Sequence, residues 1–365
     1  MVPLTSVTAA NRSLTHTQPL VAVFVGATSG IGKYTLRALA KSHGIDGSGL
    51  RVYVVGRNER VAKSIIAECN AVCSGGEFVF VEAQDLALLG DVDRVCGEVK
   101  RLEEEREGAE IERGRGDGGV GTARVDLLVM THAIFAFEDR NETKEGLDAA
   151  MSLLYYSRMR FIVDLMSLLE NSVLETGAHV VSVFGPGREA KVFPDDLSLR
   201  NPQNYGFMNM GSHVAYFTTL FMENLSRQHR LSLTHYYPSL VLTEAFGNEK
   251  LPRWFRWLFA ALKPLMSRFF FVPNEECGMR VLFLGTERYP ARGLERKRRE
   301  EKKGEVAVGS DGVEGGGHYR IDWDGEVMES EKIFAKVKKE GLGERVVRHT
   351  ESVFETIGSG AVFKE

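Results

Sequence analysis

The stretch LVAVFVGATSGIG, residues 20–32, decides the fold. It opens with an apolar run that ends at a glycine, which indicates a buried strand followed by a tight turn. The glycines at positions 26, 30 and 32 then lead into a helical pattern that begins at Ile31. A glycine-rich turn in this context is typical of a loop that cradles a pyrophosphate. The alternative interpretation is a strand–helix turn that binds no ligand.

Each glycine has a physical role in such a turn. Gly26 permits the sharp bend, Gly30 permits close approach of the backbone to a pyrophosphate, and Gly32 lets the helix pack against the strand. The N–H groups and the partial positive charge at the start of the helix attract the phosphate. The candidate phosphate-binding residues are Gly26, Thr28, Ser29, Gly30, Ile31 and Gly32.

Strand and helix patterns alternate along the rest of the chain. Strands are predicted at residues 20–25, 51–55, 78–83, 125–130, 179–183, 231–237 and 318–326. Helices are predicted at residues 31–41, 147–169, 205–227 and 274–284. This alternation predicts an α/β fold with a doubly wound parallel sheet. We assign residues 20–365 to one Rossmann-like domain and residues 1–19 to an N-terminal extension.

Two segments depart from the alternation. Residues 103–124 are charged and then glycine-rich, which predicts a solvated helix end followed by a flexible insertion. Residues 251–273 are rich in aromatic and aliphatic side chains, but charged residues and Pro264 interrupt the run of about 20 apolar residues that a membrane span needs. We interpret this second segment as an apolar lid over a substrate pocket. The alternative is peripheral contact with a membrane surface through residues 254–272.

The composition is that of an ordinary globular protein. The 365 residues are 43% hydrophobic and 26% charged, with a formal net charge of −4, which excludes a wholly disordered chain and argues against a nucleic-acid partner. Residues 1–19 lack the basic and apolar regions of a secretion signal. The four cysteines form no CxxC pair and no zinc-binding pattern. We therefore expect reduced thiols, no metal and a cytoplasmic location.

The end of the second predicted strand bears on the choice of cofactor. Arg57 and Asn58 follow this strand about 25 residues after the glycine turn, where a reader of NAD usually places an acidic residue for the ribose hydroxyls. A guanidinium instead suits a 2′-phosphate, because it pairs with phosphate in bidentate fashion. The sequence therefore predicts NADP(H) rather than NAD(H). The alternative is that Arg57 is a solvated loop residue.

The glycine turn, together with Gln84-Asp85-Leu86 after the third strand and Pro238…Thr243 after the sixth, resembles the short-chain dehydrogenase/reductase family. The resemblance implies that Asp85 and Leu86 lie at the adenine and that Pro238 and Thr243 hold the nicotinamide end. Ser239 stands where the family has glycine. Of the family's Asn-Asn-Ala-Gly after the fourth strand, only Ala133 matches.

Three further stretches make the chain similar to fungal members of the family that act in secondary-metabolite pathways. These stretches are YYSRMRF at residues 155–161, VVSVFGPGRE at residues 180–189 and the NYG…H pattern at residues 204–213. The part of the chain that resembles the family runs from about residue 20 to residue 284.

The catalytic pattern of the family is incomplete. The resemblance implies Tyr205 as proton donor, 33 residues before Pro238, but the position four residues later is Asn209 rather than lysine. The family has a serine after the fifth strand that hydrogen-bonds the reacting oxygen. Gly185 stands at that position here, and Ser182 is expected to point to a different place. Losing a cation that lowers the tyrosine pKa by about 1–3 units slows the reaction about 10- to 1000-fold. Asn209 retains the ability to hydrogen-bond the ribose.

Residues other than those at the family's catalytic positions could supply the missing positive charge or a proton for the reaction. Arg188, Lys191 and His213 are the candidates, each with the alternative of a solvated or packing role.

Two functions follow from this pattern. The first is an NADP(H)-dependent oxidoreductase that interconverts carbonyl and alcohol groups on an apolar metabolite, with Tyr205 as proton donor. The second is a degenerate nucleotide-binding protein or a non-redox isomerase on the same fold. An oligomer is expected from the family, but no interface is evident in the sequence.

Overall fold

The computed structural model describes residues 1–112, 123–134, 139–242, 271–293, 306–329 and 331–365, and they are built around one parallel sheet. The strands are ordered β3-β2-β1-β4-β5-β6-β9. Their bounds are β1 Leu20–Val25, β2 Leu50–Gly56, β3 Gly76–Glu82, β4 Leu127–Met130, β5 Ala178–Val183, β6 Leu231–Tyr236 and β9 His318–Ile321. This order confirms the predicted doubly wound α/β fold, and it reverses between β1 and β4, where such sheets bind their ligands.

Strand β1 shows why the sheet is central. All six of its residues are buried, and alternate side chains point to opposite faces. Val21, Val23 and Val25 belong to one apolar core, whereas Leu20 and Phe24 belong to the other. The continuous apolar run in the sequence therefore reflects helices on both sides of the sheet.

One face is covered by helices from the first part of the chain and one later helix. They are α1 Leu4–Thr17, α2 Gly30–His43, α3 Glu59–Val72 and α10 Asn274–Phe283. Residues 1–19 are thus mostly helical. Buried Asn11 of α1 donates from Nδ2 to the carbonyl of Met279 over 2.9 Å, which fastens α1 to α10.

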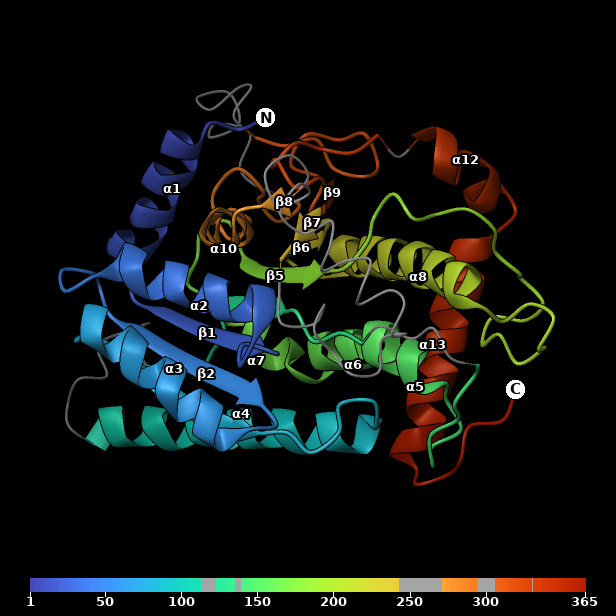
Figure 1. Ribbon diagram of the computed structural model, residues 1–365, viewed down its shortest axis with the longest axis horizontal. Helices are drawn as coiled ribbons and strands as arrows, with labels where there is room; N and C mark the ends of the chain where they lie inside the picture. The colour runs from blue at the N-terminus through green and yellow to red at the C-terminus, as the bar shows by residue number, and fades with distance from the viewer. Residues whose placement is uncertain (113–122, 135–138, 243–270, 294–305, 330) are drawn as a thin grey trace, which may run out of the picture.

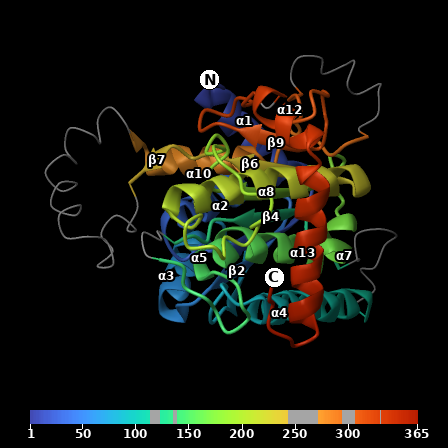
Figure 2. The same ribbon diagram turned by 90° about the vertical axis from the view of Figure 1, so that its right-hand side faces the viewer.

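The other face is covered by α4 Leu89–Glu112, η1 Ser152–Tyr156, α6 Ser157–Asp164, α7 Met166–Glu170, α8 Phe207–Gln228, α12 Glu331–Lys339 and α13 Leu342–Gly358. The short α5, Ala149–Met151, leads directly into η1. The single helix predicted at residues 147–169 is therefore interrupted, with a π-helical turn at η1. Figure 2 shows α13 crossing α8 and reaching α4.

The charged segment predicted at residues 103–124 is partly structural. Helix α4 continues to Glu112, and the prediction that this segment is wholly solvated is wrong at Glu103, which is buried. Glu103 accepts a hydrogen bond from Tyr53 and pairs with Arg51 at 2.8 Å, so strand β2 compensates its charge. Residues 113–122 of the predicted insertion lie outside the described residues.

A second, two-stranded sheet pairs β7, Leu240–Val241, with β8, Phe271–Val272. The predicted lid at residues 251–273 and the alternative membrane contact at residues 254–272 lie outside the described residues, except for the part that includes β8. In the described part of the chain, no helix combines the length and the apolar character required to span a bilayer.

Candidate functional site

The glycine turn lies at the carboxyl end of β1, beside the end of β4. Gly26 has a φ of +87° and Gly30 a φ of +53°, a region that side chains disfavour. A Cβ on Gly26 would lie 2.7 Å from the backbone nitrogen of His132, and a Cβ on Gly32 would lie 2.7 Å from the carbonyl oxygen of Gly26. Gly26 thus has a conformation that suits a sharp turn, and Gly32 lies where a side chain would meet the backbone of the turn; their roles in binding a cofactor stay predictions.

The start of α2 is suited to hold an anion. Ser29 is the N-cap residue and makes no side-chain hydrogen bond to the first turn of the helix. Thr28 and Ile31 are half-buried beside it. The combination of bare backbone at the turn and a helix N-terminus fits a diphosphate, because N–H groups and the helix dipole both favour negative charge there.

The end of β2 lies next to this turn. Gly56 ends the strand, and a Cβ there would lie 2.5 Å from Cγ2 of Thr28, so glycine permits the close approach. Arg57 is exposed beyond it. Asn58 is exposed too, and its side-chain oxygen accepts a hydrogen bond from the backbone N–H of Val61 over 3.1 Å, which caps α3. The cofactor roles given to Arg57 and Asn58 stay predictions.

The end of β3 presents Asp85 at the surface. Its Oδ1 accepts a hydrogen bond from the backbone N–H of Ala87 over 3.0 Å, while Leu86 is buried. Asp91, which the sequence analysis did not consider, accepts from the backbone N–H groups of Gln84 and Asp85 at 2.7 and 2.8 Å. An aspartate in the first turn of α4 therefore fixes the backbone that carries Asp85.

The end of β4 joins the glycine turn to the helix layer. Thr131 donates its backbone N–H to the carbonyl of Val25 over 2.9 Å, and Ala133 is exposed two residues later. Between them, His132 is buried, and its Nε2 lies 3.3 Å from the Ser157 hydroxyl oxygen. Burial, together with the nearby Arg158 guanidinium, lowers the pKa of His132 well below its ordinary value, so the ring is neutral.

Arg158 of α6 reaches the ends of β4 and β5, and the sequence analysis did not single it out. It donates to the carbonyl of His132 at 2.6 Å, to the carbonyl of Val183 at 2.9 Å and to the hydroxyl of Ser182 at 2.8 Å. The hydroxyl of Ser182 is therefore occupied at the base of the site. Gly185, at the predicted serine position, donates its N–H to His235 at 3.4 Å. One signal for Arg158 was available, because it is a charged residue within an apolar helical pattern.

Tyr205 precedes α8, which begins at Phe207, two residues later than predicted. Its hydroxyl donates to Oδ2 of Asp148 over 3.1 Å. Burial, and then the charge of Asp148, raise the pKa of Tyr205 above its ordinary value. The side-chain N–H of Asn209 donates to the carbonyl of Asn204 over 2.8 Å. Both side chains thus have partners within the protein, and their catalytic and ribose-binding roles stay predictions.

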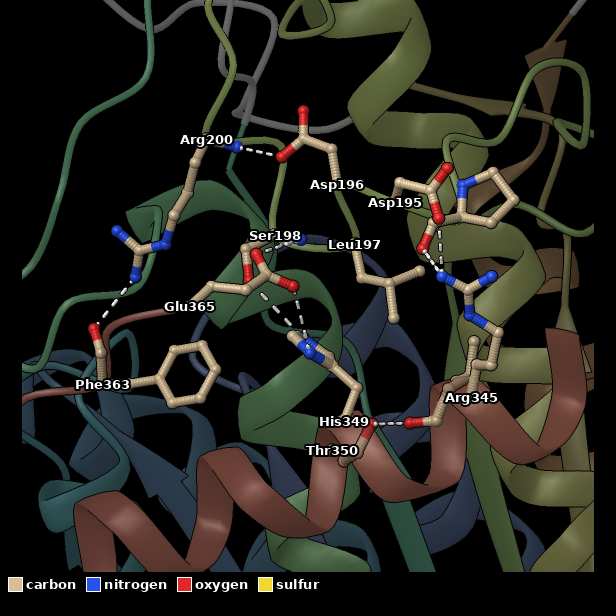
Figure 3. A network of polar contacts seen from close by, with 12 residues as sticks. Asp195, Asp196, Leu197, Ser198, Arg200, Arg345, His349, Thr350, Phe363 and Glu365 are labelled. Carbon is tan, nitrogen blue, oxygen red and sulfur yellow. Dashed lines mark hydrogen bonds and ion pairs between the residues drawn. The ribbon is translucent and has the colours of Figure 1, made fainter.

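The long loop that carries Tyr205 is fastened by the C-terminal part of the chain, as Figure 3 shows. Arg200 donates to the carbonyl of Phe363 over 2.9 Å, and Arg345 of α13 donates to Asp195 over 2.9 Å. The backbone N–H of Ser198 donates to the Glu365 carboxylate over 3.3 Å. The sequence analysis missed this arrangement because it joins segments that are far apart in the chain.

The other residues proposed to supply charge or a proton pack against aromatic rings or backbone groups of the protein. Lys191 lies 4.3 Å from the centre of the Phe193 ring, and Arg188 lies over the ring of Tyr237. His213 is buried, accepts a hydrogen bond from the backbone N–H of Phe193 over 3.0 Å, and has its pKa lowered by burial to about 4. A neutral, hydrogen-bonded histidine in the core fits the packing interpretation.

The segment after β6 contains one strained residue. Pro238 is buried, and Ser239 has a φ of +59°, a left-handed conformation that a glycine would adopt at little cost. Ser239, which stands in place of the family's glycine, thus has a left-handed conformation that favours glycine. Thr243 lies outside the described residues.

The described residues also bear on metals and thiols. Cys69, Cys73, Cys96 and Cys277 are buried free thiols. Over the part of the chain that is described, no cluster of three or more histidine, cysteine, aspartate or glutamate side chains could hold a metal ion.

Comparison with known proteins identifies the relatives of this chain. It is 36% identical over 355 residues to the short-chain dehydrogenase/reductase SAT2 of Stachybotrys chartarum, with 96% of each chain covered. It is 35% identical over 361 residues to the oxidoreductase AN1596 of Emericella nidulans, covering 97% of this chain and 98% of the relative. No family model matches.

Solved structures of other proteins share the fold of this chain. The NADPH-bound carbonyl reductase from chicken fatty liver superimposes with a TM-score of 0.51 at 14% identity, covering 86% of this chain and 99% of the other. The sequence identities to the fungal relatives, with nearly complete coverage, are the stronger result. The chain therefore belongs to the short-chain dehydrogenase/reductase family of oxidoreductases.

Proposed function

We propose that the protein uses NADP(H) to interconvert carbonyl and alcohol groups on an apolar small metabolite, in a fungal secondary-metabolite pathway. The observation that carries the proposal is the cradle formed by Gly26 and Gly32. A single added Cβ at Gly32 would lie 2.4 Å from Oγ1 of Thr131 and 2.7 Å from the carbonyl oxygen of Gly26. Backbone this close, at a helix N-terminus, is what binding of a dinucleotide diphosphate requires.

The choice of NADP(H) rests on Arg57. Its guanidinium is exposed at the end of β2, and Gly56 brings that end against Thr28 of the glycine turn. An adenosine ribose bound at this edge would place its 2′-phosphate within reach of a residue in this position. A planar guanidinium binds a phosphate through two parallel hydrogen bonds, whereas a ribose hydroxyl gains much less from it.

Calorimetry with purified protein tests this choice. We expect Arg57→Ala to weaken NADPH binding about 10- to 100-fold while NADH binding changes less than about threefold. Arg60→Ala is the matched control, because Arg60 is also exposed, three residues further on in the first turn of α3, and it should leave both affinities unchanged. Equal losses for NADPH and NADH in the Arg57 variant would contradict the 2′-phosphate assignment. Absence of binding of either nucleotide to the wild type would contradict the proposed function itself.

The chemistry proposed for the site is reduction of a carbonyl group, or its reverse. In reduction, the cofactor supplies a hydride that forms the new C–H bond, and the carbonyl π electrons move to oxygen. Tyr205 is the proposed donor of the proton that completes the alcohol. Its hydroxyl would have to exchange Asp148 for the substrate oxygen, because it now donates to that carboxylate at 3.1 Å.

Apolar side chains support an apolar substrate. Four large hydrophobic residues that follow strand ends or begin α8 are more than one-third exposed: Ile134 at 39%, Phe207 at 40%, Met208 at 67% and Leu240 at 36%. Exposed apolar side chains on segments that follow the carboxyl ends of the strands are available to contact an apolar ligand. Stopped-flow measurement of NADPH oxidation against a panel of apolar ketones and aldehydes tests this part of the proposal.

A second candidate function is nucleotide binding without redox chemistry. It is favoured by the internal hydrogen bonds of Tyr205 and Asn209, and by the absence of a lysine four residues after Tyr205. Tight NADPH binding with no turnover on any acceptor of the panel would support this second function over the first.

A further inference from the structure

Arg158 differs from the other large buried arginines of the protein. Arg158, Arg280 and Arg320 are each at most 2% exposed. Arg280 pairs with Glu276 at 2.8 Å, and Arg320 pairs with Glu189 at 2.9 Å. In the described ranges, Arg158 forms no ion pair, and its hydrogen bonds go to two carbonyl oxygens and one hydroxyl. Among the described residues, its buried charge therefore faces no neutralising carboxylate.

The sequence around Arg158 explains how it reaches this place. The π-helical turn η1 directly precedes α6 and adds a residue to the helical register. Within this turn, the hydroxyl of Tyr155 faces the hydroxyl of Thr350 on α13 at 2.7 Å, whereas Arg158, in α6, reaches the ends of the strands. Turns of this kind are frequent at functional sites.

A buried charge without a partner is expensive for a fold. Burial lowers the pKa of Arg158 to about 9, so the guanidinium still carries its charge near neutral pH. Replacing a desolvated charge by an apolar side chain is often neutral or stabilising. An uncompensated cation that is retained in a site is therefore a candidate for a functional role.

The position of this charge relates it to the cofactor. Arg158 holds the carbonyl of His132, whose backbone nitrogen would touch a Cβ on Gly26. It also holds the end of β5, two residues before Gly185. On the proposed function, the nicotinamide end of the cofactor would lie at this edge of the sheet, where Ala133 follows β4 and Gly185 follows β5. The guanidinium thus lies behind that end of the site.

We infer that the uncompensated charge of Arg158 makes the site prefer the reduced, uncharged nicotinamide to the oxidised, cationic one, and so favours reduction of the substrate. This inference rests on the proposed function. For scale, two like unit charges separated by about 8 Å repel each other, at an effective dielectric constant of about 20, by enough to raise a dissociation constant about 30-fold. The same charge stabilises the negative charge that develops on a carbonyl oxygen as it accepts a hydride.

The test compares two substitutions that differ in charge and keep hydrogen-bond donors. Arg158→Lys retains the positive charge, whereas Arg158→Gln is neutral but still offers two N–H groups to the strand ends. The measured quantity is the ratio of the dissociation constants of NADP⁺ and NADPH, obtained by calorimetry. This ratio needs no substrate, and a purely structural role for Arg158 would not move it.

We expect the Arg158→Lys ratio to lie within about threefold of wild type, and the Arg158→Gln ratio to fall about 10- to 30-fold. The matched control is Arg160→Gln. Arg160 lies two residues after Arg158 on the same helix, but its charge is paired with Asp93 and Asp164 at 2.6 and 3.2 Å. Its ratio should stay within twofold of wild type.

If Arg158→Gln fails to fold, Ser182→Asp gives the same information, because it places a carboxylate against the retained guanidinium. Its ratio should fall as well. Equal ratios for the lysine, glutamine and wild-type proteins, or for Ser182→Asp and wild type, would overturn the inference while leaving the proposed function intact. Failure of the wild type to bind either form would overturn both.

Discussion

The hydroxyl of Tyr205 donates to the carboxylate of Asp148 over 3.1 Å. The same carboxylate accepts from the backbone N–H of Met151 at 2.9 Å, so it is also the N-cap of α5. The candidate proton donor of the site is thus tied to the start of a helix that leads into η1.

This contact sets the first expectation. Asp148→Asn removes the negative charge that helps raise the pKa of Tyr205, and asparagine still caps a helix well. We expect the pKa of Tyr205 to fall toward its ordinary value of about 10. Absorbance titration at 295 nm, with Tyr205→Phe subtracted, measures it. An unchanged titration would mean that burial alone sets this pKa.

Tyr205→Phe should slow single-turnover NADPH oxidation about 100-fold, because general acid catalysis by one side chain contributes at least this much. Tyr34→Phe is the control, since Tyr34 lies on α2, where the side chains of Lys33 and Arg37 lie over its ring. A Tyr205→Phe protein as fast as the control would remove Tyr205 from the mechanism.

Alanine at Gly32 should abolish dinucleotide binding and lower stability. Its Cβ would lie 2.7 Å from the Gly26 carbonyl oxygen and 2.9 Å from Cα of Ala27, so backbone would have to move. Gly97 in α4 is the matched control, because no atom lies within 4 Å of a Cβ there. Gly97→Ala should raise the free energy of unfolding by about 0.5–1 kcal/mol. Calorimetry and urea unfolding give both results, and a Gly32→Ala protein that binds NADPH normally would contradict the assignment of the cradle.

Glycine at Ser239 should stabilise the protein by about 0.5–1 kcal/mol. The serine has a φ of +59°, and removal of its Cβ relieves a left-handed strain that exceeds the entropy added to the unfolded chain. Ser74, exposed in a turn with no positive φ, provides the control, because Ser74→Gly should destabilise the protein slightly. Denaturant midpoints compare the two variants. Equal losses of stability in both would show that Ser239 stores no strain.

Acidification should destabilise the protein below pH 6.5, in part through His349. The ring lies 2.7 Å from the Tyr156 hydroxyl, and burial lowers the pKa of His349 to about 4. The unfolded chain binds this proton at about pH 6.5 and the folded chain does not, so stability falls as the pH falls between these values. At pH 5 the loss from this residue is about 2 kcal/mol.

His349→Gln should reduce the slope of stability against pH between pH 6.5 and 5 by about one proton, as measured by urea unfolding at several pH values. A slope for His349→Gln equal to that of wild type would show that the ring already takes up its proton in the folded state.

The sequence predicted the sheet well because its strands are buried on both faces. Residues 20–25 form a short continuous apolar run, and residues 179–183 are rich in valine, so both segments read as buried strands. The glycine turn could be recognised because its glycines and their spacing lie within a few adjacent residues.

What the sequence did not predict depends on contacts between distant segments. Helix α1 is stabilised by Asn11 reaching Met279, and a polar helix of this kind has no apolar periodicity to reveal it. The burial of Glu103 requires Tyr53 and Arg51 from β2. The partner of Tyr205 is Asp148, and neither position indicates the other in the sequence.

The first residues of the chain meet residues that are synthesised near its end. The backbone N–H of Val2 donates to the carbonyl of Asp324 over 3.0 Å, and β9 pairs with β6. At about 5–20 residues per second, a ribosome needs on the order of 15–60 s to make the chain between them. During that time Val2 and the edge of β6 lack these partners, so slow translation or early termination should send this protein to chaperones and proteases.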